Sequence, residues 1–306
     1  MTPDHALVSE LTPTAEALLG RHLATAKEWF PHELVPWGRG RDFTPGEVWD
    51  EETAELPVEV RSALFVNLLT EDNLPYYFWT LDHIFGAGPV WGEWARRWTT
   101  EEMRHSMVIR DYLMVTRAID PVALERARMV QVGNGVVPCP DFAADGFVYV
   151  ALQELATRVA HHNTGKALQA TDRAGYEVMK RVAADENLHY LFYRDLATAA
   201  IAVDPSAMVL AIERQVHDFE MPGTGIPDFA IHAKAIARAG IYDFQIHHDQ
   251  ILVPVVLRHW DLEHLEGLSP EAEQARARVL KRIERIGRAG RRFASRNEEL
   301  ATAATG

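Results

Sequence analysis

The sequence predicts an all-α fold in which four long helices form a bundle around a metal site. First, it contains long stretches with helical periodicity and no convincing alternating strand pattern. Second, a carboxylate and an imidazole stand at positions i and i+3 in two segments, Glu102-Met103-Arg104-His105 and Glu186-Asn187-Leu188-His189. Third, a lone glutamate precedes each segment at nearly the same distance, Glu71 by 31 residues and Glu154 by 32.

This spacing predicts two helix pairs that share one interior. Residues at i and i+3 lie side by side on a helix face, and about thirty residues accommodate a helix, a turn and an antiparallel return helix. Glu plus Glu-x-x-His from each pair is the ligand set of ferritin-like di-iron and di-manganese proteins. Such carboxylates offset the charge of two close cations, and one imidazole per metal suits iron and, less well, manganese. A single Glu-x-x-His is common on solvated helix faces, but two copies with matched upstream glutamates are hard to explain in that way.

The helix boundaries follow from proline, glycine and aspartate signals. Proline is tolerated in the first helical turn, so Thr12-Pro13, Asp120-Pro121 and Asp204-Pro205 are expected helix starts. Pro75 should kink the helix that carries Glu71, one turn beyond that residue. The expected helices cover about residues 12–29, 57–85, 90–118, 143–170, 173–202, 228–239, 242–264 and 271–300, with shorter helices after 120 and 204.

We expect a single ferritin-like domain over residues 1–306. Its metal-binding bundle would span about 57–202, and flanking and C-terminal helices would occupy 203–300. Residues 37–45 should be irregular, and the Gly/Pro-rich loop at 133–140 should separate the two helix pairs.

Composition narrows the class of protein. The chain has 306 residues, is 47% hydrophobic and contains one cysteine, Cys139, which we expect to be inert. A disulfide framework or a cysteine-rich zinc site is therefore excluded, and a reducing cytosol fits. No signal segment or membrane-spanning apolar run is apparent, so a cytoplasmic location is expected.

The net charge of −13 disfavours nucleic-acid binding. The last helix is nevertheless crowded with basic residues that could receive an acidic partner: Arg276, Arg278, Lys281, Arg282, Arg285, Arg288, Arg291 and Arg292. A second basic group, Lys27, Arg39 and Arg41, lies near the N-terminal loop.

The segments around these motifs resemble the soluble acyl-[acyl-carrier-protein] desaturases, and actinobacterial members more than plant ones. The resemblance covers roughly Trp29 to Phe293. Its phrases are Thr70-Glu71-Asp72-Asn73-Leu74-Pro75, Trp98-Thr99-Thr100-Glu101-Glu102-Met103-Arg104-His105, Gln153-Glu154-Leu155-Ala156-Thr157 and Ala184-Asp185-Glu186-Asn187-Leu188-His189, with support from Asn163-Thr164-Gly165 and Met221-Pro222. Ferritins and methane-type monooxygenases share the ligand plan but not these flanking residues.

The resemblance implies a homodimeric, oxygen-dependent enzyme of fatty acid biosynthesis. It would introduce a cis double bond into a saturated acyl chain held on acyl carrier protein, with electrons from reduced ferredoxin or a similar carrier. Two iron ions per chain, with manganese as a substitute, would be bound by Glu71, Glu102, His105, Glu154, Glu186 and His189. Glu102 and Glu186 would bridge the two metals in the reduced state.

The resemblance also implies roles for residues around the ligands. Thr157 would face bound oxygen and help to deliver protons. Asp185 would hydrogen-bond a histidine ligand, expected to be His105. Trp37 would either form an electron path with Asp185 or be a packing residue. Trp98, one turn before Glu102, is either an active-site residue or bundle core.

Several alternatives stay open at this point. His161 is expected to be a residue that supports the ligands, or a hydrogen-bonded core residue, rather than a ligand, because the ligand set is complete without it. His162 replaces a small residue of the plant pattern. The segment after Met221 is shorter than in plant members and their extended C-terminal tail is missing, so chain length and double-bond position do not carry over. A related di-iron hydroxylase or oxygenase, or a non-catalytic ferritin-like metal binder, would share the ligand set.

Overall fold

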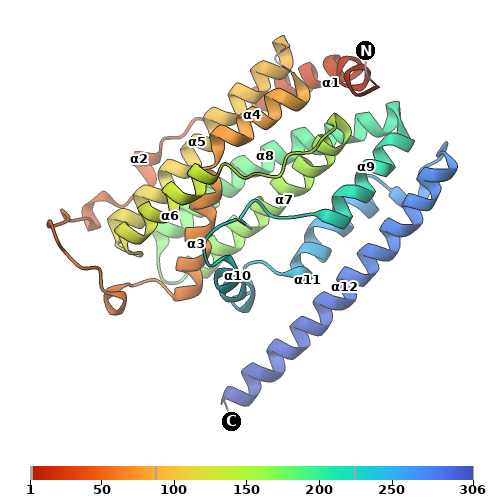
Figure 1. Cartoon of the computed structure of the whole chain (residues 1–306). Coiled ribbons are helices and arrows are strands. Elements are labelled where there is room, and N and C mark those ends of the chain that lie inside the picture. Colours follow the sequence, from red (N-terminus) through yellow and green to blue (C-terminus); the bar gives the residue numbers. More distant parts are fainter. Residues whose placement is uncertain (1–2, 87, 224, 306) are drawn as a thin grey trace.

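The computed structural model describes the backbone of residues 3–86, 88–223 and 225–305. Within these ranges the chain forms helices and loops and no strand, which confirms the all-α prediction (Figure 1). The α-helices are α1 (Pro3–Thr25), α2 (Pro31–Leu34), α3 (Val58–Glu71), α4 (Leu74–Phe85), α5 (Pro89–Thr116), α6 (Pro121–Asn134), α7 (Ala143–Leu168), α8 (Arg173–Val203), α9 (Pro205–Asp218), α10 (Phe229–Arg238), α11 (Phe244–Ile246) and α12 (Pro270–Thr305). Three 3₁₀ turns (Trp37–Arg39, Glu51–Thr53 and Leu262–His264) and a π-helix (His247–His259) complete the described elements.

The four helices that carry the predicted ligands, α3, α5, α7 and α8, form the central bundle. Helix α7 is buried around most of its circumference, because α8, α9, α4 and α1 all pack against it. A helix that is apolar all round belongs in the interior, and Phe147, Val148 and Leu152 are fully enclosed there. Figure 1 shows α12 as a long helix on the outer side of α9. Across the described residues, no helix combines the length and the apolar character needed to cross a bilayer.

The helix that carries Glu71 ends there, so the prediction of a continuous, kinked helix is wrong. Pro75 lies in the first turn of α4, where its missing N–H costs nothing. Between the two helices, the Asp72 N–H donates to the Leu68 carbonyl and the side chain of Asn73 donates to the Val136 carbonyl at 3.3 Å. The break leaves Glu71 as the last residue of α3, facing the bundle interior.

Two other helix predictions differ from the structure. Helix α1 begins at Pro3 and runs through Pro13 rather than starting there. The expected helix over 242–264 is divided into α11, the π-helix and a 3₁₀ turn. Pro254 lies inside the π-helix, and because proline has no N–H it cannot supply the backbone bond of a regular α-helix.

Candidate metal centre and active site

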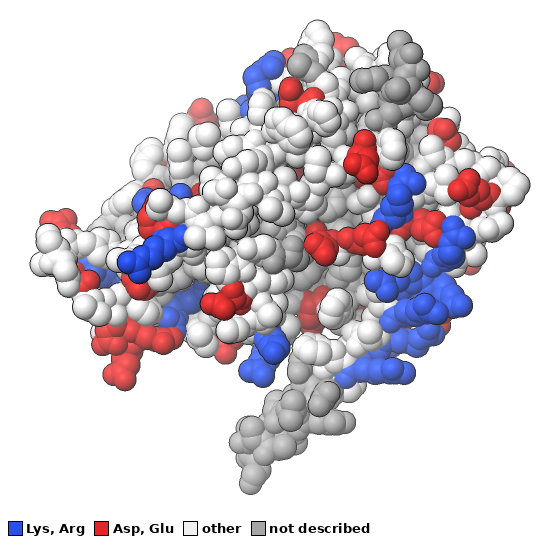
Figure 2. Space-filling model, in the orientation of Figure 1, with Lys and Arg blue, Asp and Glu red and all other residues white. Residues whose placement is uncertain are grey.

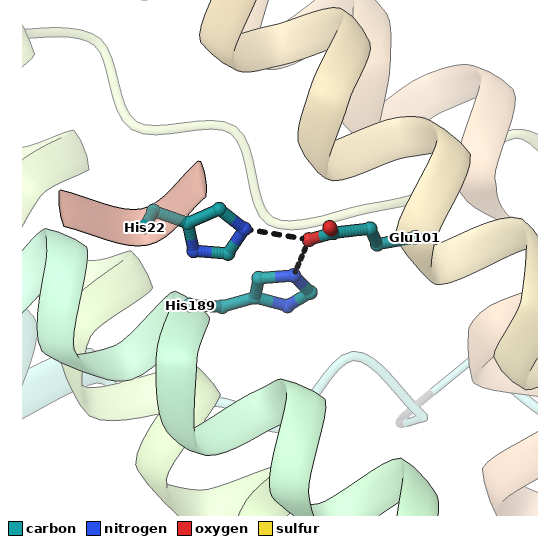
Figure 3. A group of neighbouring side chains, drawn as sticks. All are labelled: His22, Glu101 and His189. Carbon is teal, nitrogen blue, oxygen red and sulfur yellow. Dashed lines mark hydrogen bonds and ion pairs between the residues drawn. The ribbon is translucent and has the colours of Figure 1, made fainter. Parts of the chain in front are cut away.

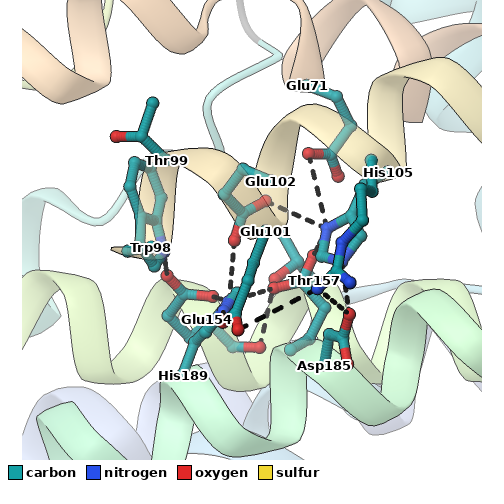
Figure 4. Close-up of polar contacts among 12 residues, drawn as sticks. Glu71, Trp98, Thr99, Glu101, Glu102, His105, Glu154, Thr157, Asp185 and His189 are labelled. Carbon is teal, nitrogen blue, oxygen red and sulfur yellow. Dashed lines mark hydrogen bonds and ion pairs between the residues drawn. The ribbon is translucent and has the colours of Figure 1, made fainter. Parts of the chain in front are cut away.

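The six predicted ligands meet in one buried cluster, with contributions from all four bundle helices (Figure 4). Helix α3 supplies Glu71, α5 supplies Glu102 and His105, α7 supplies Glu154, and α8 supplies Glu186 and His189. The donor atoms form two groups of four, and within each group all atoms lie within 4.8 Å of one another. Because Glu102 and Glu186 belong to both groups, the cluster has room for two neighbouring cations with two shared carboxylates.

One of the two positions is centred on His189. Its Nδ1 atom lies 2.7 Å from Glu102 Oε1, 3.6 Å from Glu186 Oε2 and 3.8 Å from Glu154 Oε2. Nevertheless, His189 Nδ1, Glu102 Oε1 and Glu186 Oε2 are buried without a hydrogen-bond partner. These atoms point toward one common position without forming hydrogen bonds with one another, as the ligands around a cation do.

The other position is centred on His105. Its Nδ1 atom lies 3.0 Å from Glu102 Oε2, 3.5 Å from Glu186 Oε1 and 3.9 Å from Glu71 Oε2. Each histidine therefore faces the same two shared carboxylates and one glutamate of its own. The shared pair corresponds to the two residues that the sequence predicts as bridges.

The electrostatics of the cluster call for cations. Burial, together with the Glu102 carboxylate, raises the pKa of Glu71 to about 8 and, together with Glu186, raises the pKa of Glu154 well above its usual range. Burial alone would lower the pKa of His105, but the Glu102 carboxylate raises it well above the ordinary value. Four carboxylates in one dry site are costly unless protons or metal ions neutralise them. Carboxylate oxygens with one imidazole per position fit iron, and also manganese.

Behind His105 lies a carboxylate that the sequence analysis singles out, Asp185. Its Oδ2 atom lies 3.5 Å from His105 Nε2 and accepts a hydrogen bond of 2.7 Å from the indole Nε1 of Trp29. The Trp29 ring stacks on His105 with a centroid distance of 6.4 Å, and the guanidinium groups of Arg104 and Arg181 lie over the same indole at 5.0 and 5.7 Å. Both arginines also pair with Asp185.

The structure does not bring Trp37 to this network. Trp37 is half exposed, and its Nε1 donates to the His32 carbonyl at 2.9 Å. The indole beside Asp185 belongs to Trp29, for which the sequence predicts no role in the site. Of the other predicted residues, Trp98 donates from Nε1 to Glu154 Oε1 at 2.9 Å, and Thr157 is buried one turn after Glu154.

A second carboxylate, that of Glu101, supports His189, a role that the sequence does not predict. Its Oε2 atom lies 3.0 Å from His189 Nε2 and 2.9 Å from the Nε2 of His22, which comes from α1 (Figure 3). Arg97 forms an ion pair with the other oxygen of Glu101. Glu101 directly precedes Glu102, just as Asp185 directly precedes Glu186. The carboxylate before each shared glutamate thus supports the histidine of the opposite helix.

Of the two expectations for His161, the structure favours the residue that supports the ligands. Its Nε2 atom lies 3.2 Å from Glu71 Oε1 and 3.3 Å from Glu186 Oε1, and its ring is buried. It therefore orients two ligands by hydrogen bonding. His162 points the other way and is exposed.

An apolar cleft between α4 and α7 leads away from the cluster. It is lined by Thr70, Glu71, Leu74, Tyr77, Thr80, Leu81, Ile84, Trp98, Glu102, Pro138, Pro140, Tyr149, Val150, Gln153, Thr157, Glu186 and Pro222. Its free volume is about 40 Å³, so a long ligand enters only if side chains move. Pro138, Pro140, Tyr149 and Pro222 also line an open surface groove of about 440 Å³, here called the mouth groove, where Cys139 is exposed.

A buried carboxylate and histidine cluster that could hold metal, inside a helical bundle and facing an apolar cleft, defines a protein of the ferritin-like class. The model of the family described as "Fatty acid desaturase" matches residues 4–305, and the chain belongs to this family. It is accordingly an enzyme, an oxidoreductase.

Known relatives agree over most of their length. The "Putative acyl-[acyl-carrier-protein] desaturase DesA1" of Mycobacterium tuberculosis is 40% identical over 294 residues, which cover 92% of this chain and 86% of that protein. The chloroplastic "Stearoyl-[acyl-carrier-protein] 9-desaturase" of Spinacia oleracea is 29% identical, with coverage of 93% and 75%. The X-ray structure of putative acyl-ACP desaturase DesA2 from Mycobacterium tuberculosis superposes with a TM-score of 0.70 and 28% identity, and covers 88% of this chain and 99% of that one.

Proposed function

We propose that this protein introduces a cis double bond into a saturated acyl chain carried as a thioester on acyl carrier protein. The observation that carries the proposal is that the cleft joins the carboxylate cluster to the surface. Glu71, Glu102 and Glu186 line its inner part, whereas prolines of the mouth groove line its outer part. An acyl chain inserted from the surface would therefore pass beside the metal positions. The names of the relatives supply the reaction and the carrier.

Two iron ions bound by the six ligands would supply the activation of dioxygen. Overall, the acyl chain loses two hydrogens, and dioxygen takes up two electrons and two further protons to give two waters. The apolar lining, including Leu81, Ile84 and Val150, orients the chain and excludes water. Thr157 and Glu186 both line the cleft. The Oγ1 hydroxyl of Thr157 donates to the backbone carbonyls of Gln153 and Glu154 at 3.2 and 3.0 Å in this structure, and we propose that it rotates toward the cluster to donate a proton during turnover.

For the electron path we propose Trp29 in place of Trp37. Trp29, Asp185 and His105 form an unbroken chain of contacts from near the surface to one metal position. Reduced ferredoxin or a similar carrier would deliver the electrons. A homodimer and two iron ions per chain, with manganese as a substitute, complete the proposal.

The test is to supply iron-loaded protein with reduced ferredoxin, dioxygen and a set of saturated acyl carrier protein thioesters. The masses of the acyl products are then measured by mass spectrometry. A mass loss of two hydrogens supports desaturation, whereas gain of an oxygen atom identifies a hydroxylase. Bound metal without any product in the whole set identifies a metal binder. Glu102→Ala protein serves as the control because it lacks a shared ligand.

A further inference from the structure

We propose that the acidic carrier protein docks on a basic band of α12 that lies across α9 from the mouth groove. The band consists of Arg278, Lys281, Arg282 and Arg285. Figure 2 shows the lysines and arginines gathered along α12, whereas acidic and uncharged residues cover much of the neighbouring surface. This inference rests on the proposed function, because that function names the carrier.

The helix face that carries the band is fixed against the core, and two of the four cations are free to bind a partner. On its inner side, Val279 and Ile283 are buried in the core. Arg278 forms an ion pair with Glu213 of α9, and Arg282 donates to the His217 carbonyl at 3.3 Å.

Lys281 and Arg285 are exposed and have no ion pair among the residues that the structure describes. They stand four residues apart on the same helix face. Together with Val216 of α9, the band lines a shallow groove of about 270 Å³. Two unpaired cations on a fixed base, above a shallow groove, fit an acidic helix of a partner.

Helix α9 connects the band with the mouth groove. Arg214, Gln215 and Asp218 line the mouth groove, whereas Glu213 and His217 line the band's groove. The two grooves therefore lie on two sides of a single helix, about 10 Å across. The flexible arm that links the thioester to its carrier needs to cross only this helix to place the acyl chain at the cleft.

Charge explains why docking would occur beside the mouth groove rather than over it. The described lining of this groove comprises four carboxylates, Asp141, Asp145, Asp218 and Glu220, and one arginine, Arg214, which is paired with Asp145. The whole chain carries −13. An acidic carrier is repelled by both, so a local patch of cations must overcome the repulsion.

The other basic group near the N-terminal loop fits less well. Arg39 is paired with Asp172 and Glu55, and Arg41 is paired with Glu47. Their charge is already neutralised within the chain. Only Lys27 of that group has no ion pair within the described residues.

The experiment compares two double variants with the same change in charge. Lys281→Glu with Arg285→Glu reverses the band, and Lys234→Glu with Arg238→Glu reverses an exposed lysine and arginine at the same spacing on α10. The dissociation constant for the pantetheinylated carrier is measured at low and high ionic strength. We expect the band variant to bind about 10- to 100-fold more weakly at low salt and the difference to shrink at high salt, because ions screen the lost attraction. The α10 variant should stay within about 3-fold of the wild type.

Metal content and the thermal midpoint of unfolding check that both variants are folded. Equal weakening by both variants would show a net-charge effect and overturn the docking site, and unchanged binding by the band variant would also overturn it. A band variant that becomes monomeric where the wild type is dimeric would assign α12 to the contact between copies and overturn it as well. Because binding is measured without turnover, a wild type that binds through the band but forms no product would refute the desaturase reaction and leave the docking site standing.

Discussion

Replacing Glu101 by Gln tests whether each supporting carboxylate serves only the metal position of the histidine it contacts. Glu101 Oε2 lies 3.0 Å from His189 Nε2, and the amide cannot offer the same charge-assisted hydrogen bond to both His189 and His22. A hydrogen bond to a charged group contributes about 1.5–3 kcal/mol. This energy corresponds to a loss of about 10- to 100-fold in metal affinity, the size that loss of an outer partner usually has. The loss should fall on the position of His189.

In the assay, metal-free protein is titrated stepwise with ferrous iron. Binding is monitored by a spectroscopic signal that distinguishes the two metal positions. Asp185→Asn is the matched variant, because the same substitution removes the charge behind His105. Glu101→Gln should weaken one of the two binding steps and Asp185→Asn the other, while iron in excess still fills both. Equal weakening of both steps by Glu101→Gln would refute the crosswise assignment, and so would an affinity equal to that of the wild type.

Three further predictions address the centre, the cleft and the fold. Glu102→Ala should lose both metals and all turnover yet keep its helical circular dichroism, because it removes a shared ligand; full activity of this variant without metal would end the hypothesis. Leu81→Trp should fill the cleft, slow turnover of long acyl chains at least tenfold and cost about 1–3 kcal/mol of stability, while iron content stays the same; unchanged kinetics would exclude the cleft as the acyl site. Asp172 should stabilise the fold above about pH 4. Burial alone would raise the pKa of Asp172, but the hydrogen bonds from Arg39 and the Gly175 N–H hold this pKa below its ordinary value. The contribution of Asp172 to stability is therefore fully present above the pKa of the unfolded state and is lost as pH falls through the pKa of the folded state. Asp172→Asn should therefore be less stable by about 1–3 kcal/mol at pH 7 and converge with the wild type in acid, as measured by urea unfolding; a gap that persists at pH 2 would contradict this.

The bundle and the clustering of the six expected ligands could be predicted because helical periodicity is local. The i, i+3 spacing fixes that Glu102 and His105 share a face, and the repeated interval pairs the helices. Neither the spacing nor the interval predicts which side chains hydrogen-bond to the ligands from outside the cluster. Glu101 is rotated by about 100° from Glu102 along the helix, and its partner His22 is 79 residues away on α1.

Trp29 and Trp37 show the same limit. Trp29 lies in the loop after α1, beyond the last turn of that helix, and Trp37 opens a short 3₁₀ turn. Neither belongs to a long periodic helix, so the sequence does not indicate which indole turns inward. A complete ligand set predicts that His161 is not a ligand, but it does not predict the contacts of His161 with Glu71 and Glu186, which depend on the rotation of α7 in the bundle. Contacts between distant segments require the packed structure.

The break between α3 and α4 connects the end of α3, which carries Glu71, with the loop that lines the mouth groove. Glu71 is the only one of the six expected ligands at a helix end, where the chain passes through a two-residue turn into α4. Two residues further on, Asn73 is fully buried and holds the carbonyl of Val136, which lines the mouth groove. The other residue of the linker, Asp72, accepts a hydrogen bond from Ser106 of α5 and forms an ion pair with Arg128 of α6. The end of α3 that carries Glu71 and the loop at the mouth groove therefore share one network of side-chain contacts with α5 and α6.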